Sequence, residues 1–205
     1  MNDMDIRDRA ACQGVTVIDR AEGLASIHDA GVAAVLWRRP RPAGFYNWLA
    51  GLPPEQLPST RLTLEPGAVR DAITALCDAS RMPDTGERTW LIDDIAALAE
   101  HFAAIMRAPR IRLRLDVIRG IMCPKFHVDT VTARLLCTYR GPGTQYGLGR
   151  HGNAPDEVFA TPTGIPLLLR GKHGQQDGAT ALVHRSPPIE PLGDTRLLLV
   201  LDPMA

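Results

Sequence analysis

Residues 111–118 read Ile-Arg-Leu-Arg-Leu-Asp-Val-Ile. Apolar side chains alternate in this stretch with Arg112, Arg114 and Asp116, and such a period of two is typical of a β-strand with one buried face. Further stretches of strand length and composition follow, separated by glycine and proline clusters, at residues 134–139, 165–169, 180–184 and 196–201. The C-terminal part of the chain therefore predicts a β-sandwich or barrel.

Upstream of this stretch, the apolar residues recur mostly at helical spacing. The longest such segment covers residues 87–108 and ends at Pro109, which predicts a long helix with one buried face. Shorter helices are predicted at residues 21–30, 45–49 and 67–79, and short strands at 15–18 and 32–37. We expect a single α+β domain over residues 1–205, in which a mainly helical support region (1–110) packs on a β core (111–205) that carries the functional site.

The composition excludes several classes of protein. The 205 residues contain 23 Lys and Arg against 23 Asp and Glu, so there is no basic excess for binding nucleic acid. No run of 18 apolar residues occurs and the first residues are polar, so we expect neither a membrane span nor a signal peptide, and a cytoplasmic location. The four cysteines form no CxxC pair, which argues against a disulfide scaffold.

His127 and Asp129 form the most informative motif. On a strand this spacing places both side chains on one face, with Cα atoms about 6 to 7 Å apart, where both can reach one metal ion. His184 ends one predicted strand and Arg196 begins the next. Two imidazoles and one carboxylate make the facial triad of non-haem ferrous iron sites, and an arginine nearby is an anchor for a carboxylate. The simpler alternative is a histidine at a strand end beside a solvated aspartate.

Residues 111–203 resemble the Fe(II)/2-oxoglutarate-dependent oxygenases. The ordered set HxD, His, Arg carries the resemblance, and the segments RLLCTY, GPGTQY and TGIPLLLRG are similar to the prolyl-hydroxylase-like branch. The resemblance implies a double-stranded β-helix core of the jelly-roll or cupin type. It further implies His127, Asp129 and His184 as iron ligands and catalytic centre, Arg196 as the anchor of 2-oxoglutarate, and Tyr139 as a second contact to it. The substrate would be a small molecule or a protein.

The whole chain also resembles a bacterial family of unknown function that is often encoded near zinc-responsive genes, a likeness carried by KFHVDTVTARLLCTYRGPGTQY. Zinc is therefore an alternative to iron. Cys123 and Cys137 could join the triad in a tetrahedral zinc site, because thiolates favour zinc over ferrous iron. The chain would then be a zinc-binding or zinc-homeostasis protein without redox chemistry. Alternatively, both cysteines are small buried side chains.

Overall fold

Two β-sheets and a layer of helices make up the computed structural model, which describes residues 14–120, 123–149, 152–174, 182–188 and 195–205. The helices are α2 (Phe45–Gly51), α3 (Val69–Ala79) and α4 (Gly86–Met106), with 3-10 turns η1 (Ala21–His28), η2 (Pro54–Gln56), η3 (Pro66–Ala68) and η4 (Lys172–Gly174). The strands are β1 (Val15–Ile18), β2 (Ala34–Trp37), β3 (Thr60–Leu64), β4 (Arg110–Ile118), β5 (Ala133–Arg140), β6 (Gln145–Leu148), β7 (Phe159–Ala160), β8 (Leu167–Arg170), β9 (Leu182–Arg185) and β10 (Arg196–Met204).

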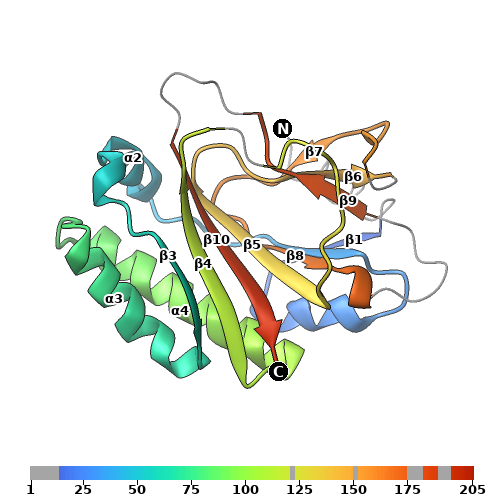
Figure 1. Ribbon diagram of the computed structural model, residues 1–205, viewed down its shortest axis with the longest axis horizontal. Helices are drawn as coiled ribbons and strands as arrows, with labels where there is room; N and C mark the ends of the chain where they lie inside the picture. Colours follow the sequence, from blue (N-terminus) through green and yellow to red (C-terminus); the bar gives the residue numbers. More distant parts are fainter. Residues whose placement is uncertain (1–13, 121–122, 150–151, 175–181, 189–194) are drawn as a thin grey trace.

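The larger sheet has seven strands in the order β1-β2-β8-β5-β10-β4-β3, and the smaller has three in the order β7-β6-β9 (Figure 1). Within the larger sheet only β1 and β2 pair in parallel, and the other pairings are antiparallel. The fold is thus mixed α/β and dominated by a large, mostly antiparallel sheet.

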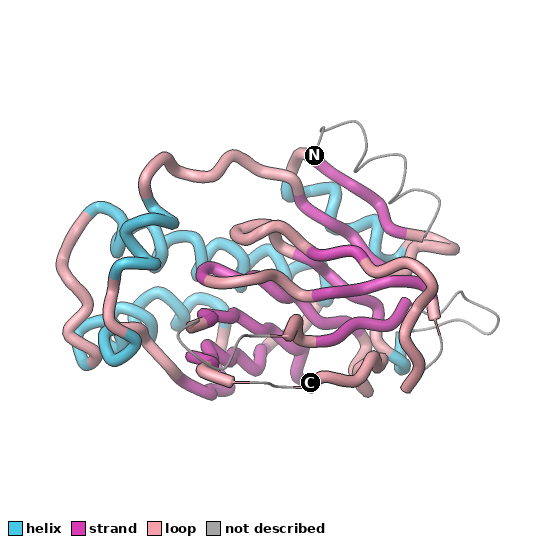
Figure 2. The backbone as a smooth tube through the Cα atoms, turned by 90° about the horizontal axis from the view of Figure 1, so that it is seen from above, coloured by secondary structure: helices cyan, strands magenta, loops and turns pink. Residues whose placement is uncertain are grey.

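Helix α4 covers one face of the large sheet and crosses behind it in Figure 1. Its start is capped by Thr85, whose hydroxyl oxygen accepts a hydrogen bond from the Arg88 amide. It ends at Arg107, which adopts a left-handed conformation with φ of 51°, shortly before Pro109. Figure 2 shows the same helix running alongside the strands.

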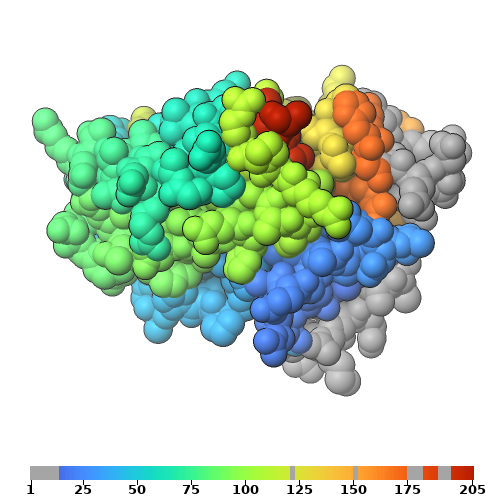
Figure 3. Space-filling model, turned by 90° about the horizontal axis from the view of Figure 1, so that it is seen from below, coloured from blue at the N-terminus to red at the C-terminus, as the bar shows by residue number. Residues whose placement is uncertain are grey.

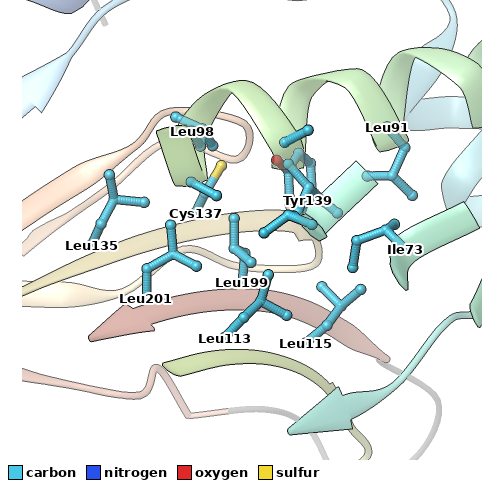
Figure 4. Packing of buried hydrophobic residues seen from close by; sticks show 14 of the residues in the cluster. Ile73, Leu91, Leu98, Leu113, Leu115, Leu135, Cys137, Tyr139, Leu199 and Leu201 are labelled. Atoms are coloured by element: carbon cyan, nitrogen blue, oxygen red, sulfur yellow. The ribbon is translucent and has the colours of Figure 1, made fainter. Parts of the chain in front are cut away.

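Alternation along the central strands divides the side chains between two environments. On β5 the odd-numbered residues from Ala133 to Tyr139 pack with the helices in the main hydrophobic core, as do Leu113 of β4 and Leu199 of β10 (Figure 4). The opposite face packs against the small sheet, where residues of the two sheets form a second apolar cluster that includes Leu136, Leu198, Val200, Tyr146 and Leu182. The polar residues of this inner face build the candidate site.

Most predicted elements of the front half are present, but this half is more than a helical support. It contributes β1, β2 and β3 to the large sheet, so its strands continue the C-terminal strands on both sides. The predicted helix at residues 21–30 is the 3-10 helix η1, and it lies against α4, where His28 Nε2 is 3.0 Å from the carbonyl oxygen of Ile105. Figure 3 shows this N-terminal segment beside the α4 region of the surface.

Three short strands were not predicted: β3, β6 and β7. The five residues of β3 form an edge strand between two prolines, and all but its ends are exposed, so its apolar pattern is weak. Strands β6 and β7 have four and two residues and lie in a glycine-rich part of the chain. Over the ranges that the structure describes, no helix combines the length and apolarity needed to cross a bilayer.

Candidate metal centre

His127 and His184 are brought together by the backbone. The two residues form an antiparallel β-bridge, in which the His127 amide donates to the His184 carbonyl at 3.0 Å and the His184 amide donates back at 2.9 Å. Their ring centroids lie 4.5 Å apart. His184 is itself part of β9, where it pairs with Tyr146 of β6. The small sheet therefore fixes one histidine, and the bridge extends that sheet to the other.

The chain after Asp129 is held by the turn that follows β8. The Lys172 amide donates to the Asp129 carbonyl at 2.8 Å, and the Gly171 amide donates to the Thr132 carbonyl at 2.9 Å. A Cβ atom at Gly171 would lie 2.0 Å from the carbonyl oxygen of Val131, so only glycine allows this approach. These contacts place the Asp129 carboxylate beside the two imidazoles.

The three side chains converge as a metal site requires. Each offers one ligand atom, and the three atoms lie within 4.8 Å of one another. Asp129 Oδ2 is 3.1 Å from Nε2 of His184, and Oδ1 is 3.7 Å from Nε2 of His127. The His127 Nδ1 atom donates to the Lys125 carbonyl at 2.9 Å, which leaves its Nε2 lone pair available to a metal.

The Oδ2 atom of Asp129 faces His184 without a well-formed hydrogen bond. This atom is buried and has no hydrogen-bond partner in the described part of the chain. Burial alone raises the pKa of a carboxyl group, but at Asp129 the two imidazoles and the Arg134 guanidinium outweigh burial and hold the pKa well below its usual range. The site thus offers a buried carboxylate oxygen that lies 3.1 Å from an imidazole nitrogen without a hydrogen bond, and a cation bound between the two atoms would satisfy both.

The pKa values of the two histidines are shifted in opposite directions. Burial lowers the pKa of His184, which favours the neutral imidazole that a metal needs. The neighbouring Asp129 carboxylate raises the pKa of His127, since its negative charge favours the protonated imidazole in the metal-free protein. A metal ion on the Nε2 atoms would replace that proton. The residues present therefore fit a divalent metal bound by two histidines and one aspartate.

Arg134 orients the carboxylate of Asp129 from outside the cluster. One of its Nη atoms, Nη1, binds Asp129 Oδ1, while Nε and Nη2 form a bidentate pair with Asp202 at 2.6 and 2.8 Å. Asp202 is buried near the end of β10. Sequence reasoning missed this pair, although the alternation of β5 places Arg134 on the face opposite Tyr139.

Arg196 lies on the same inner face and is fully buried. Its Nη2 atom donates to the hydroxyls of Thr138 at 3.0 Å and Thr144 at 2.9 Å, and its Nη1 atom lies 3.5 Å from Ser186 Oγ. Ser186 follows His184 by two residues, so the guanidinium lies next to the strand that carries a metal ligand.

No described carboxylate forms an ion pair with Arg196, and its Nε atom is buried without an acceptor. Burial lowers the pKa of Arg196 to about 10, because a cation is poorly solvated there. A buried cation surrounded by neutral hydroxyls is a receptor for an anion. Thr138, Thr144 and Ser186 were not predicted as site residues.

Tyr139 lies on the opposite side of the sheet from the histidine cluster. Its ring is buried in the core beneath α4, and its hydroxyl donates to Asp94 Oδ2 at 2.6 Å (Figure 4). Burial, followed by the charge of Asp94, raises the pKa of Tyr139 well above its usual range. The expectation that Tyr139 contacts 2-oxoglutarate is thus not supported by its position, because strand alternation turns Thr138 toward the site instead.

We expect Tyr139→Phe to lower the free energy of unfolding by about 1 to 3 kcal/mol, because it removes a hydrogen bond to a buried carboxylate. Urea denaturation measures the loss. Tyr46→Phe is the matched control, since the buried Tyr46 hydroxyl has no hydrogen-bond partner among the described residues, and its removal should cost little. A drop in 2-oxoglutarate affinity in Tyr139→Phe at unchanged stability would contradict this assignment.

The two cysteines considered as zinc ligands are not part of the cluster. Cys137 shares the helix-facing side of β5 with Tyr139, and burial raises its pKa to about 12, so it is a thiol at neutral pH (Figure 4). Cys123 is exposed and has a φ of 42°. In the described ranges, the cluster of possible metal ligands around Asp129 contains only the two histidines besides it.

Neither Cys123→Ser nor Cys137→Ser is therefore expected to change the dissociation constant for iron or zinc. Competition with a chromogenic chelator measures both constants, and a thermal melt of Cys137→Ser controls for loss of structure at that buried position. A sharp loss of zinc affinity in a folded serine variant would restore the thiol as a ligand.

Comparison with known proteins identifies a family and related folds. Residues 19–202 match the family described as "Protein of unknown function (DUF1826)". Among curated proteins, none matches the sequence. The structure of AtDAO1, dioxygenase for auxin oxidation 1 from Arabidopsis thaliana, in its binary complex with 2-oxoglutarate has a TM-score of 0.51 at 13% identity, over 93% of this chain and 92% of that one.

Two further solved structures are similar over most of their length. The rice dioxygenase for auxin oxidation gives a TM-score of 0.48 at 16% identity, with 93% of this chain and 83% of that chain covered. A Pseudomonas putida prolyl-4-hydroxylase gives 0.43 at 13% identity, with 90% and 99% covered. At these identities the likeness concerns the fold, and the AtDAO1 match shows that this fold resembles that of a 2-oxoglutarate-binding dioxygenase.

Proposed function

The chain belongs to the DUF1826 family, and we propose that it is an oxygenase that binds ferrous iron through His127, Asp129 and His184 and uses 2-oxoglutarate as co-substrate. The observation that carries the proposal is the convergence of two imidazoles and a carboxylate whose second oxygen is buried without a hydrogen bond. Such a donor set occupies one face of an octahedral ion and leaves the other positions for ligands.

The sheet arrangement supports a double-stranded β-helix. The two sheets pack face to face through a shared apolar cluster, and the bridge between His127 and His184 adds the segment around residue 127 to the small sheet. The three side chains that would hold the metal lie at the edge of the smaller sheet. The same architecture places Arg196 of the larger sheet beside Ser186, at the end of β9.

The division of roles among the residues follows from their contacts. When bound, the iron supplies the activation of oxygen, with 2-oxoglutarate as the co-substrate. Arg196 binds the distal carboxylate of 2-oxoglutarate, helped by the hydroxyls of Thr138 and Thr144 that already orient its guanidinium. Arg134 holds the Asp129 carboxylate in the orientation that the metal needs. The apolar cluster between the sheets limits the access of water to these groups.

Zinc at the same three residues is the rival outcome. Zinc sites with two histidines and one carboxylate exist, but a structural zinc site takes four protein ligands. No described thiol approaches the cluster, and the buried cation at Arg196 has no role in a zinc-storage site. The structure thus favours iron with an organic acid as co-ligand.

An anaerobic titration tests the proposal. Protein loaded with ferrous iron is mixed with 2-oxoglutarate, and its visible absorption is recorded. We expect a new charge-transfer band that saturates at one 2-oxoglutarate per chain and that succinate does not produce, because only the 2-oxo acid chelates the metal. Iron-loaded protein that shows no band at saturating 2-oxoglutarate would overturn the co-substrate assignment.

A further inference from the structure

Three arginines lie side by side on the inner face of the large sheet, beyond the part that the small sheet covers. They are Arg61 of β3 and Arg112 and Arg114 of β4, and we refer to them as the arginine patch. Arg61 and Arg112 are exposed, and Arg114 is half-buried. The patch was not part of the site expected from the sequence.

The strand register shows that the patch is electrostatically unfavourable. Arg61 is the direct partner of Arg114 in the antiparallel pair of β3 and β4, and Arg112 is the partner of the neighbouring Thr63. Residues directly opposite one another in an antiparallel pair project from the same face, and like charges in that position destabilise the sheet. Two guanidinium groups therefore stand opposite each other with a third beside them.

The carboxylates nearest the patch are Asp116 and Asp202, and within the described ranges neither forms a close ion pair with its arginines. Within the described ranges, Arg61 and Arg112 take part in no hydrogen bond or ion pair. Arg114 has only a distant contact, 3.9 Å from its Nη1 to Asp116 Oδ2, and its Nε atom is buried without an acceptor. Asp202 is the cross-strand partner of Arg112, but both of its oxygens bind Arg134, so no described carboxylate lies within hydrogen-bond distance of the three cations.

Side chains at one level of neighbouring strands connect the patch to the candidate metal centre. Arg112 is the direct partner of Asp202 on β10, Asp202 binds Arg134 of β5, and Arg134 binds Asp129. Arg112 and Arg134 lie on strands separated only by β10, so their Cα atoms are about 10 Å apart. A molecule that reaches the metal over this face would meet the patch with its far end.

We propose that the arginine patch binds the carboxylate or phosphate group of the oxygenase substrate, a small molecule that carries this anionic group at the end remote from its oxidised carbon. The inference rests on the proposed function, because the metal centre defines where oxidation occurs. An unpaired like-charge contact that costs stability is expected where a ligand supplies the missing counter-charge. The anion then relieves the repulsion and fixes the orientation of the substrate.

An NMR titration of the metal-free full chain with inorganic phosphate, and in parallel with citrate, tests the proposal. We expect the amide signals of β3 and β4 to shift and to saturate with added anion. Tighter binding of phosphate indicates a phosphate group on the substrate, and tighter binding of citrate indicates a carboxylate. Arg61→Gln should weaken the binding at least about tenfold. Arg81→Gln, which removes an exposed charge at the end of α3, should leave it unchanged.

The melting temperature of the anion-free variants separates a ligand site from a structural role. Arg61→Gln should melt about 1 to 3 °C higher than the parent chain, since it removes a like-charge pair. A lower melting temperature, or unchanged binding of both anions in this variant, would overturn the proposal. The experiment uses no metal, so its result is independent of the iron titration. Failure of anion binding alone overturns the patch, and failure of iron and 2-oxoglutarate binding alone overturns the proposed oxygenase function.

Discussion

Asp129→Ala is expected to lower the affinity for ferrous iron by more than about 100-fold. Substituting a residue that only hydrogen-bonds to a metal ligand lowers metal affinity about 10- to 100-fold, and this substitution removes a ligand itself. The carboxylate supplies the only negative charge of the cluster, and its buried Oδ2 atom faces His184 without a hydrogen bond among the described residues. Calorimetric titration with iron under nitrogen measures the affinity.

The fold should survive this substitution, because Arg134 keeps its bidentate pair with Asp202. His173→Ala serves as the matched control. His173 is exposed in the turn beside Lys172, outside the cluster, so its loss should not change iron affinity. Tight iron binding by a folded Asp129→Ala protein would place the metal elsewhere.

Arg196→Met is expected to weaken 2-oxoglutarate binding by at least about 30-fold while the iron affinity stays unchanged. The guanidinium is fully buried and donates to hydroxyls, and no described carboxylate forms an ion pair with it. Removing it leaves the distal carboxylate of the ligand without a counter-charge. The charge-transfer band of the iron-loaded protein gives the 2-oxoglutarate affinity.

Arg196→Met is also expected to raise the thermal stability of the protein, although it weakens 2-oxoglutarate binding. Burial lowers the pKa of Arg196 to about 10, so below that pH the charged guanidinium reduces the stability of the folded protein. In the absence of 2-oxoglutarate, Arg196→Met should therefore melt at a higher temperature than the parent protein. A lower melting temperature combined with unchanged 2-oxoglutarate affinity would assign Arg196 a purely structural role.

The sequence predicted the elements with long, regular patterns. The alternation of residues 111–118 and the helical spacing of 87–108 correspond to β4 and α4 within one or two residues. Short strands such as β3 and β7 escaped because a few residues, mostly exposed, carry no clear period. Their pairing partners are distant in sequence, and pairing over such distances leaves no local signal.

The candidate site was predictable in composition but not in orientation. His127, Asp129 and His184 do meet, yet the bridge that joins His127 to His184 links residues 57 apart and has no sequence signature. For β5, periodicity divides the residues into two faces but does not say which one faces the site. The resemblance suggested Tyr139, whereas the helices bury that face and Thr138 contacts Arg196.

The most direct test of the central claim is the metal content of the protein purified under nitrogen, without chelators, from metal-replete cells. Mass spectrometry of the parent chain and of a His127→Ala/Asp129→Ala variant gives iron and zinc per chain. We predict close to one iron per chain in the parent and none in the variant. One zinc per chain with no iron, or equal metal in both proteins, would contradict an iron centre at these residues.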